Sequence, residues 1–227
     1  MQKQFFSLFA LALALVQSAY AMGEDREWIS FNKLMEVTFL DKFYDSPAAT
    51  RDKITMRGAM FPLNKEIKPS DVVLTIVHAE GRERTRVSAD GTFDLRPSEK
   101  LTKANPMVYI NMPKGEKASL QFGLYAVLPP GQSMSYVSLL GGVKQANDLV
   151  KAKAGLLRVF APKFNGVELH FAQSAQQQLQ IISKGGVRTL TADAKGALAL
   201  RLDEAVFSDN PQIILSERPF EVEITAE

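Results

Sequence analysis

Short apolar segments separated by turn residues recur along most of the chain, and this pattern favours β-strands. Residues 72–77 are almost continuously apolar and rich in β-branched side chains, which is typical of a buried strand. Residues 118–124 and 220–224 alternate apolar and polar positions, as a half-buried strand does. About six or seven such segments occur per hundred residues, with turn signals between them. This spacing predicts a mainly β protein of β-sandwich type.

One part of this pattern occurs twice. Residues 84–95 are followed by Asn105-Pro106, and residues 188–200 are followed by Asn210-Pro211. Five positions match at one offset of 105 residues: Gly91 with Gly196, Phe93 with Leu198, Leu95 with Leu200, Leu101 with Val206 and Asn105 with Asn210. The Arg-Thr pairs at 84–85 and 188–189 are one residue closer, which predicts a one-residue insertion in the turn of one copy. We therefore expect two tandem, internally duplicated β-sandwich modules.

The turn inside the repeat is expected to join two strands of a hairpin, 85–87 and 92–95 in the first copy. Gly91 supplies the positive φ that a tight turn needs. The sequence Asp90-Gly91-Thr92-Phe93-Asp94-Leu95 is similar to the D-G-x-F-x-L hairpin of transthyretin-like and carboxypeptidase-regulatory-like β-sandwiches. The resemblance covers about eight residues, and the second copy lacks both the Asp and the Phe. It implies a small exported β-sandwich, of immunoglobulin-like or transthyretin-like type.

Each module is predicted to open with a short helical segment. Between residues 28 and 43, apolar side chains recur every three or four positions, which fits one helical face. Met35, Val37 and Phe39 also alternate, so a strand remains an alternative there. Residues 133–154 show a second helical pattern with Ser133 or Ser135 as N-cap. Because each glycine costs a helix roughly 1 kcal/mol, the pair at 141–142 predicts a kink or a helix-like loop.

The N-terminus has the pattern of a secretory signal peptide. Lys3 precedes an apolar stretch from Phe5 to Val16, and Ala19 and Ala21 are the small residues that precede a cleavage site. The stretch is too short for a membrane span. The predicted division of the chain is a cleaved signal peptide at 1–21, a first module at 22–127, a linker at 128–132 with two prolines and a glycine, and a second module at 133–227.

Composition narrows the class of protein further. Apolar residues form 46% of the chain and charged residues 23%, which is enough to build a folded core. An exported protein with no cysteine fits the bacterial periplasm better than a disulfide-bonded secretory route. The formal charge of +2 falls to +1 when Lys3 is removed with the signal peptide. A nearly neutral chain gives no reason to expect nucleic acid as a partner, and no second apolar stretch predicts a transmembrane span.

Catalytic and metal-binding motifs are missing from the sequence. The two histidines, His78 and His170, do not occupy equivalent positions in the repeat and show no metal-ligand spacing, so both are expected on exposed strand surfaces. No nucleophile elbow and no phosphate-binding loop is present. The acidic pairs Asp41 with Asp45 and Asp203 with Glu204 are expected on solvated faces or at helix caps. We predict no catalytic, metal or cofactor-binding residue, no cofactor, and a protein that is not an enzyme.

The first module opens with a dense group of aromatic side chains. Most are expected in the core, but any that are not would form the likeliest interaction surface: Trp28, Phe31, Phe39, Phe43 and Tyr44. The function expected is that of an exported binding or envelope-assembly protein, with another envelope protein or a peptide as partner. One alternative is a periplasmic chaperone that completes a partner's sheet with an exposed edge strand. Another is a hydrolase in which a histidine meets a carboxylate at a non-standard site.

Overall fold

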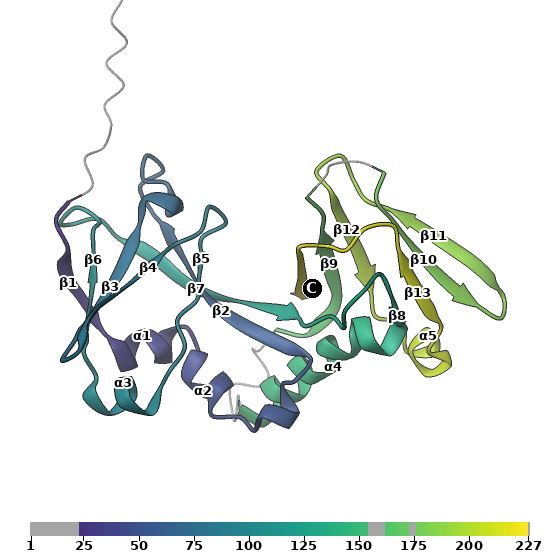
Figure 1. Ribbon diagram of the computed structural model, residues 1–227, viewed down its shortest axis with the longest axis horizontal. Helices are drawn as coiled ribbons and strands as arrows, with labels where there is room; N and C mark the ends of the chain where they lie inside the picture. Colours follow the sequence, from purple (N-terminus) through teal and green to yellow (C-terminus); the bar gives the residue numbers. More distant parts are fainter. Residues whose placement is uncertain (1–22, 154–161, 173–175, 227) are drawn as a thin grey trace, which may run out of the picture.

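The protein, seen in a computed structural model that describes residues 23–153, 162–172 and 176–226, is mainly β with 40% strand and 25% helix. Its strands form three antiparallel sheets. This confirms the mainly β class predicted from the pattern. The segment predicted as a signal peptide, residues 1–21, lies outside the described residues. Figure 1 shows two lobes, which we call the first lobe (residues 23–126) and the second lobe (residues 133–226).

The described residues form seven strands in each lobe. The first lobe consists, in chain order, of β1 (Arg26–Ser30), α1 (Phe31–Val37), α2 (Leu40–Tyr44), a 3-10 turn (Ala48–Thr50), β2 (Ile54–Pro62), a second 3-10 turn (Pro69–Asp71), β3 (Val73–His78), β4 (Gly81–Arg86), β5 (Thr92–Phe93), α3 (Glu99–Ala104), β6 (Met107–Ile110) and β7 (Ala118–Ala126). The second lobe consists of β8 (Ser133–Ser135), α4 (Tyr136–Lys153), β9 (Phe164–His170), β10 (Gln178–Ser183), β11 (Gly186–Thr191), β12 (Ala197–Arg201), α5 (Glu204–Asp209), β13 (Gln212–Leu215) and β14 (Glu221–Ala226).

The same strand order is found in both lobes. One four-stranded sheet has the order β1-β6-β3-β4, and the other has the order β8-β13-β10-β11. The third sheet has six strands in the order β5-β2-β7-β14-β9-β12, so each lobe supplies three of them. Because β7 pairs with β14 at its centre, this sheet runs through both lobes. The predicted linker at 128–132 lies between β7 and β8, and the lobes are joined by the sheet as well as by the linker.

The offset of 105 residues holds in both lobes, and the predicted insertion is wrong. Val87 donates its backbone N–H to Val72 at 3.0 Å, and Ala192 donates to Gln177 at 2.8 Å. In the turns that follow, Gly91 donates to Ser88 at 2.9 Å and Gly196 donates to Asp193 at 3.0 Å. Each of these bonds in the first lobe has its counterpart in the second lobe 105 residues later. The two Arg-Thr pairs therefore do not occupy equivalent positions, and their similarity is no sign of an insertion.

The predicted hairpin around Asp90-Gly91 is also wrong. Strand β4 pairs with β3 through the turn at 79–80, whereas β5 pairs with β2 in the six-stranded sheet. The glycine does have the expected positive φ, +88° at Gly91. A tight turn at this place therefore carries the chain from one sheet to another, because the residues after it find their partners on β2.

The opening segments combine a strand and a helix. Trp28 and Ile29 belong to β1, and the helical face predicted for this region forms only after them, as α1 and α2. The two helices are separated at Phe39, which has a φ of +56°. In the second lobe α4 continues through Gly141 and Gly142 as one helix, so the alternative of a helix-like loop is wrong. The Ser135 side chain accepts the Ser138 N–H at 3.1 Å, which confirms Ser135 as the N-cap.

In each lobe an Asn-Pro sequence follows a short helix and forms hydrogen bonds to the start of the opening helix, α1 or α4. Asn105 and Asn210 end α3 and α5 in the left-handed conformation. Their side-chain oxygens accept the backbone N–H of Asn32 and Val137, both at 2.9 Å. The carbonyl oxygen of Pro106 accepts the Phe31 N–H at 2.8 Å, and that of Pro211 accepts the Tyr136 N–H at 2.9 Å. Because the first N–H groups of a helix lack internal partners, these bonds fix the start of α1 and α4.

The second-lobe equivalent of β2 lies later in the chain than the sequence suggested. The apolar pattern Leu-Leu-Arg-Val-Phe at residues 156–160 predicts a match to residues 54–61, but this segment lies outside the described residues. The pairing identifies the equivalent as β9, because β9 lies between β14 and β12 as β2 lies between β7 and β5. One face of the six-stranded sheet contributes to the core, with Met56, Met60, Val167, Leu169, Val222 and Ile224 all buried. Helix α4 packs on this face at the junction, where Gly142 approaches Ile54 and Ile224.

Candidate functional site

The second face of the six-stranded sheet carries a cluster of ionisable side chains at the junction of the lobes. Successive side chains on a strand point to opposite faces, so the residues between the buried ones share this face. They come from four adjacent strands: Arg57 of β2, Tyr125 of β7, Glu221 and Glu223 of β14, and Glu168 and His170 of β9. We call these six residues the junction cluster.

The register of the strands places members of the cluster side by side. Tyr125 is paired with Glu223 across β7 and β14, and Glu223 is paired with Glu168 across β14 and β9. His170 is paired with Glu221 in the neighbouring row of the same face. Because adjacent strands lie about 4.8 Å apart, these side chains are close enough to share one ligand.

Arg57 connects the two lobes. Its guanidinium donates to a Glu221 carboxylate oxygen at 2.5 Å and lies 4.2 Å from the centre of the Tyr125 ring. Gly123 makes this possible, since a Cβ atom there would lie 2.5 Å from the Tyr125 hydroxyl oxygen. The ring of Tyr125 can therefore lie along its own strand, where Arg57 covers it. The Glu221 side chain is only 14% exposed, so loss of this arginine would leave a largely buried carboxylate without its ion-pair partner.

His170 lies among the carboxylates. Its Nε2 atom is 3.4 Å from Glu168 and 3.8 Å from Glu223. The imidazole also lies 6.2 Å from the ring of Phe220, which is 70% exposed and is the largest apolar side chain beside the cluster.

Burial, with a smaller contribution from neighbouring carboxylates, raises two pKa values in the cluster. Burial raises the pKa of Glu223, His170 opposes the shift, and the charges of Glu168 and Glu221 add to it. Burial and the charges of Glu221 and Glu223 raise the pKa of Tyr125 to about 12. Within the junction cluster, three carboxylates accompany one arginine and one histidine. The cluster can therefore accept hydrogen bonds from an amine or from hydroxyl groups, and it disfavours an anion.

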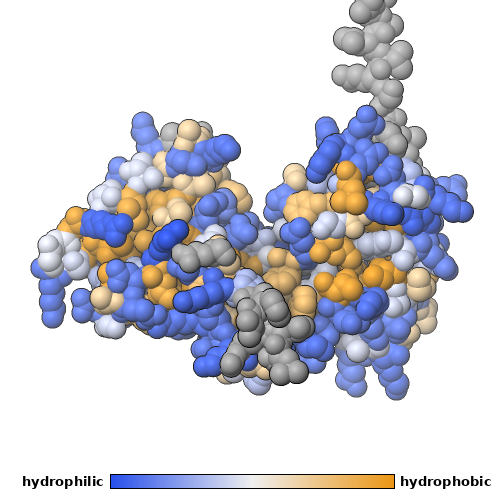
Figure 2. Space-filling view, turned by 180° about the vertical axis from the view of Figure 1, so that it is seen from behind, coloured by the Kyte–Doolittle hydropathy of each residue, from blue (hydrophilic) through white to orange (hydrophobic). Residues whose placement is uncertain are grey.

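The junction cluster faces the notch between the lobes. In Figure 1 the strands of the six-stranded sheet occupy the inner sides of the two lobes, and the four-stranded sheets lie on the outer sides. Since the apolar face is directed at the core, the polar face is directed at the notch. Figure 2 shows this notch from behind as an indentation of the surface between the lobes.

Most of the aromatic side chains that open the first lobe pack in its core or against it. Phe31 is fully buried and Phe43 is 5% exposed, so both belong to the core. Trp28 and Tyr44 are partly buried against the same core. Phe39 is 54% exposed because its left-handed backbone directs it away from the core, towards the edge of the Phe122 ring at 5.6 Å. The core packing expected from helical spacing is therefore found for Phe31 and Phe43, whereas Phe39 is exposed.

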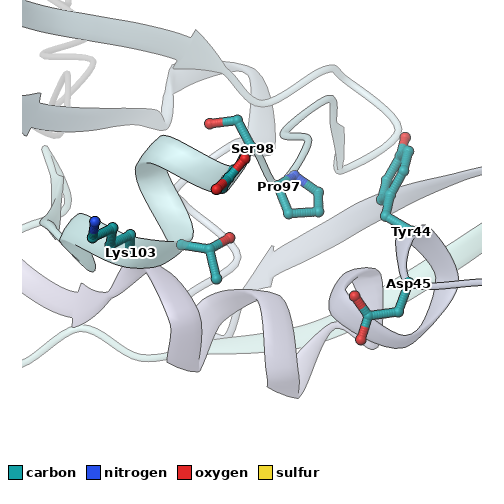
Figure 3. A pocket seen from close by; sticks show the side chains of 7 residues that line it. Tyr44, Asp45, Pro97, Ser98 and Lys103 are labelled. Carbon is teal, nitrogen blue, oxygen red and sulfur yellow. The ribbon is translucent and has the colours of Figure 1, made fainter.

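A shallow pocket of about 420 Å³ lies between the end of α2 and the start of α3. Figure 3 shows Tyr44 and Asp45 on one side of it and Pro97, Ser98 and Lys103 on the other. Ser98 caps α3 by accepting the Leu101 N–H at 3.2 Å. Arg51 lies over the Tyr44 ring at 5.1 Å. These contacts are accounted for by helix capping and packing, and they do not assemble a reactive group.

His78 and the acidic pairs have structural partners. The His78 side chain is 9% exposed and its Nε2 atom lies 2.9 Å from Glu83, so the expectation of an exposed histidine is wrong here. Asp203 caps α5 through Ala205 and Val206, as expected for a cap carboxylate. Asp41 pairs with Lys42 at 2.9 Å. Among the described residues, no group of three His, Cys, Asp or Glu side chains is arranged to hold a metal ion.

Comparison with known proteins adds a partial match. Residues 67–171 match the model of a family described as "Protein of unknown function (DUF2987)". The match begins before β3, crosses the linker at 128–132 and ends after β9, so it includes strands of both lobes. No curated protein and no solved structure matches the chain significantly. In the part of the chain that the structure describes, no helix is long and apolar enough to cross a membrane.

Proposed function

We propose that this chain is an exported, non-enzymatic binding protein of the bacterial periplasm that holds its ligand in the notch between its lobes. The observation that carries the proposal is the junction cluster, because two lobes contribute ionisable side chains to one polar surface in a concave place. The three carboxylates of the cluster, Glu168, Glu221 and Glu223, favour a ligand that donates hydrogen bonds, such as a basic peptide or an oligosaccharide.

We further propose that the two lobes are copies of one β-sandwich module. The equal strand orders, the equal hydrogen bonds at an offset of 105 residues and the two Asn-Pro connections support a duplication. Equivalent strands, β7 and β14, pair antiparallel at the centre of the sheet. A local two-fold axis between two copies would produce this arrangement.

Export rests on the sequence. Residues 1–21 have the pattern of a signal peptide, and the chain contains no cysteine. Expression in a bacterium with fractionation and mass measurement tests this part of the proposal. The periplasmic fraction should contain a chain that begins at Met22, and a full-length chain in the cytoplasm would contradict it.

The ligand is tested by a thermal-shift screen of short basic peptides, oligosaccharides and peptidoglycan fragments with the mature chain. A ligand of the notch should raise the Tm of the wild type and have little effect on Glu168→Gln, which removes one charge of the cluster. Glu66→Gln is the matched control, because Glu66 is exposed in the loop after β2. A ligand that stabilises Glu168→Gln as strongly as the wild type binds elsewhere, and the proposal for the notch would then fail.

A hydrolase is the second candidate, because His170 lies 3.4 Å from Glu168. A histidine held by a carboxylate is a common arrangement for a general base. The pocket between α2 and α3 is distant from this pair in the sequence and belongs to the first lobe alone. Turnover of chromogenic esters or glycosides that disappears in His170→Gln would favour this candidate over the binding protein.

A further inference from the structure

Among the described strands, β4 forms a free edge of the first lobe, and it carries an arginine at every second position. β4 is the last strand of its four-stranded sheet and pairs with β3 alone. Arg82, Arg84 and Arg86 occupy alternate positions of this strand, so their side chains lie on the same face of the sheet. All three are exposed.

The backbone groups of these arginines point towards the open edge. In an antiparallel pair, every second residue exchanges hydrogen bonds with its partner. The 3.0 Å bond from the Val87 N–H to the Val72 carbonyl identifies which residues these are. Counting back along the register, Thr85, Glu83 and Gly81 are bonded to β3. The N–H and C=O groups of the three arginines are therefore directed away from β3, where a further strand would bind.

The second lobe shows that the fold does not require these charges. Strand β11 is the equivalent edge, with the same exposure pattern along its six residues. At the positions equivalent to the three arginines it has Val187, Thr189 and Thr191. Charged side chains on an edge strand often prevent aggregation. Because β11 has the same edge without them, protection of the edge does not explain why β4 has three.

The positive surface formed by Arg82, Arg84 and Arg86 is only as wide as β4 itself. On the same face, Asp25 lies 4.0 Å from Arg84 and accepts a hydrogen bond from Thr75 at 3.1 Å. Glu27 accepts a hydrogen bond from the Tyr109 hydroxyl at 3.1 Å. Asp25 and Glu27 thus lie beside the arginines, on the side where the other strands of the sheet are. An anionic membrane lying flat on this face would meet these carboxylates, whereas an extended chain along the edge would meet the arginines.

We propose that β4 binds an extended acidic segment of a partner protein, which adds a fifth strand to the sheet. The segment would pair its backbone with residues 82, 84 and 86, and its carboxylates, at alternate positions, would lie opposite the arginines. This surface is separate from the junction cluster, so the inference does not rest on the ligand proposed for the notch.

The test uses a labelled peptide with glutamates at alternate positions and threonines between them, and a peptide of the same composition with its glutamates in one block. The mature chain should bind the alternating peptide more tightly in fluorescence anisotropy. Replacing the arginines by the residues of β11, as Arg82→Val, Arg84→Thr and Arg86→Thr together, should weaken binding roughly tenfold or more. Circular dichroism and the urea midpoint check that this variant folds.

The reverse replacement keeps the proposal testable if the first variant does not fold. Val187→Arg, Thr189→Arg and Thr191→Arg together should create a second binding edge on β11. Hydrogen exchange provides the structural readout: the peptide should slow exchange of the amides of Arg82, Arg84 and Arg86, and leave those of Glu83 and Thr85 unchanged. Equal binding of the two peptides, or binding without this protection, overturns the proposal. So does tighter binding to vesicles of anionic lipid through the same arginines.

Discussion

Tyr125 on β7 and Glu223 on β14 are paired across the centre of the six-stranded sheet. This pair joins two lobes that otherwise have separate four-stranded sheets. On one face of the sheet the junction is covered by α4, and on the other it carries the junction cluster. The central strands β7 and β14 therefore both join the lobes and carry part of the proposed site.

Removing the link between Arg57 and Glu221 should destabilise the protein. Arg57→Ala leaves the largely buried Glu221 carboxylate without its partner and uncovers the Tyr125 ring, so we expect a loss of about 1–3 kcal/mol in the free energy of unfolding. Urea denaturation followed by circular dichroism measures it. Lys33→Ala, which removes an exposed ion pair with Glu36, is the control and should have little effect. A loss as small as that of the control would show that the link contributes nothing.

Glu223 should make the stability depend on pH. Because burial and the charges of Glu168 and Glu221 raise its pKa above the unfolded value, against the opposing effect of His170, the folded state binds the proton more tightly. The unfavourable effect is absent below the unfolded pKa of 4.5, grows as the pH rises above that value, and is complete above the folded pKa. Glu223→Gln should be more stable than the wild type at pH 7 and no more stable at pH 4. Urea midpoints at the two pH values decide the question, and an equal difference at both would contradict the assignment.

The repeat and its glycines could be predicted because they depend on local geometry. A positive φ at Gly91 and Gly196 is required by the turn itself, and the apolar positions around it reveal the strands. The helices α3 and α5 were missed, although Ser98 and Asp203 are good N-caps and Asn105 and Asn210 are good C-caps. These cap residues were available in the sequence, but a helix of six residues gives too short a periodic pattern to be detected.

The partners of the strands could not be predicted, and the site depends on them. The alternation of Glu168 and His170 with apolar residues showed a half-buried strand, but not that Glu223 and Tyr125 lie beside it. The turn at Asp90-Gly91 has the same sequence requirements whether the next strand returns to β4 or joins β2. Such pairings are decided by the burial of whole sheets, which a local pattern does not contain.

The Asn-Pro connection should contribute to stability through the side chain of its asparagine. Asn210→Ala removes the bond to the Val137 N–H and places alanine in the left-handed conformation, and together these should cost about 1–3 kcal/mol. Asn210→Gly is the informative comparison, since glycine tolerates the backbone but also lacks the side chain. Urea denaturation should rank the glycine variant between the wild type and the alanine variant. An alanine variant as stable as the glycine variant would rule out a cost of the backbone conformation.

Two adjacent glycines of α4 should respond in opposite directions to the same substitution. Replacing a glycine inside a helix by alanine normally stabilises it by roughly 1 kcal/mol. A Cβ atom at Gly141 would lie 3.1 Å from the Cδ atom of Lys53, whose flexible side chain can move aside, so Gly141→Ala should be neutral or stabilising. A Cβ atom at Gly142 would lie 3.0 Å from the Lys53 carbonyl oxygen and 3.1 Å from an Ile54 methyl group, where the backbone of β2 must shift.

Gly142→Ala should therefore lower the stability despite its better helix propensity, and it should weaken the contact between α4 and the first lobe. That contact includes the 3.0 Å bond from the Lys53 N–H to the Gln145 side chain, so faster hydrogen exchange at the Lys53 amide is expected in Gly142→Ala and not in Gly141→Ala. Thermal unfolding of the two variants measures the stability difference. If both alanines stabilise the protein, α4 can move away from β2, and close packing of the helix against the first lobe is not what selects glycine at position 142.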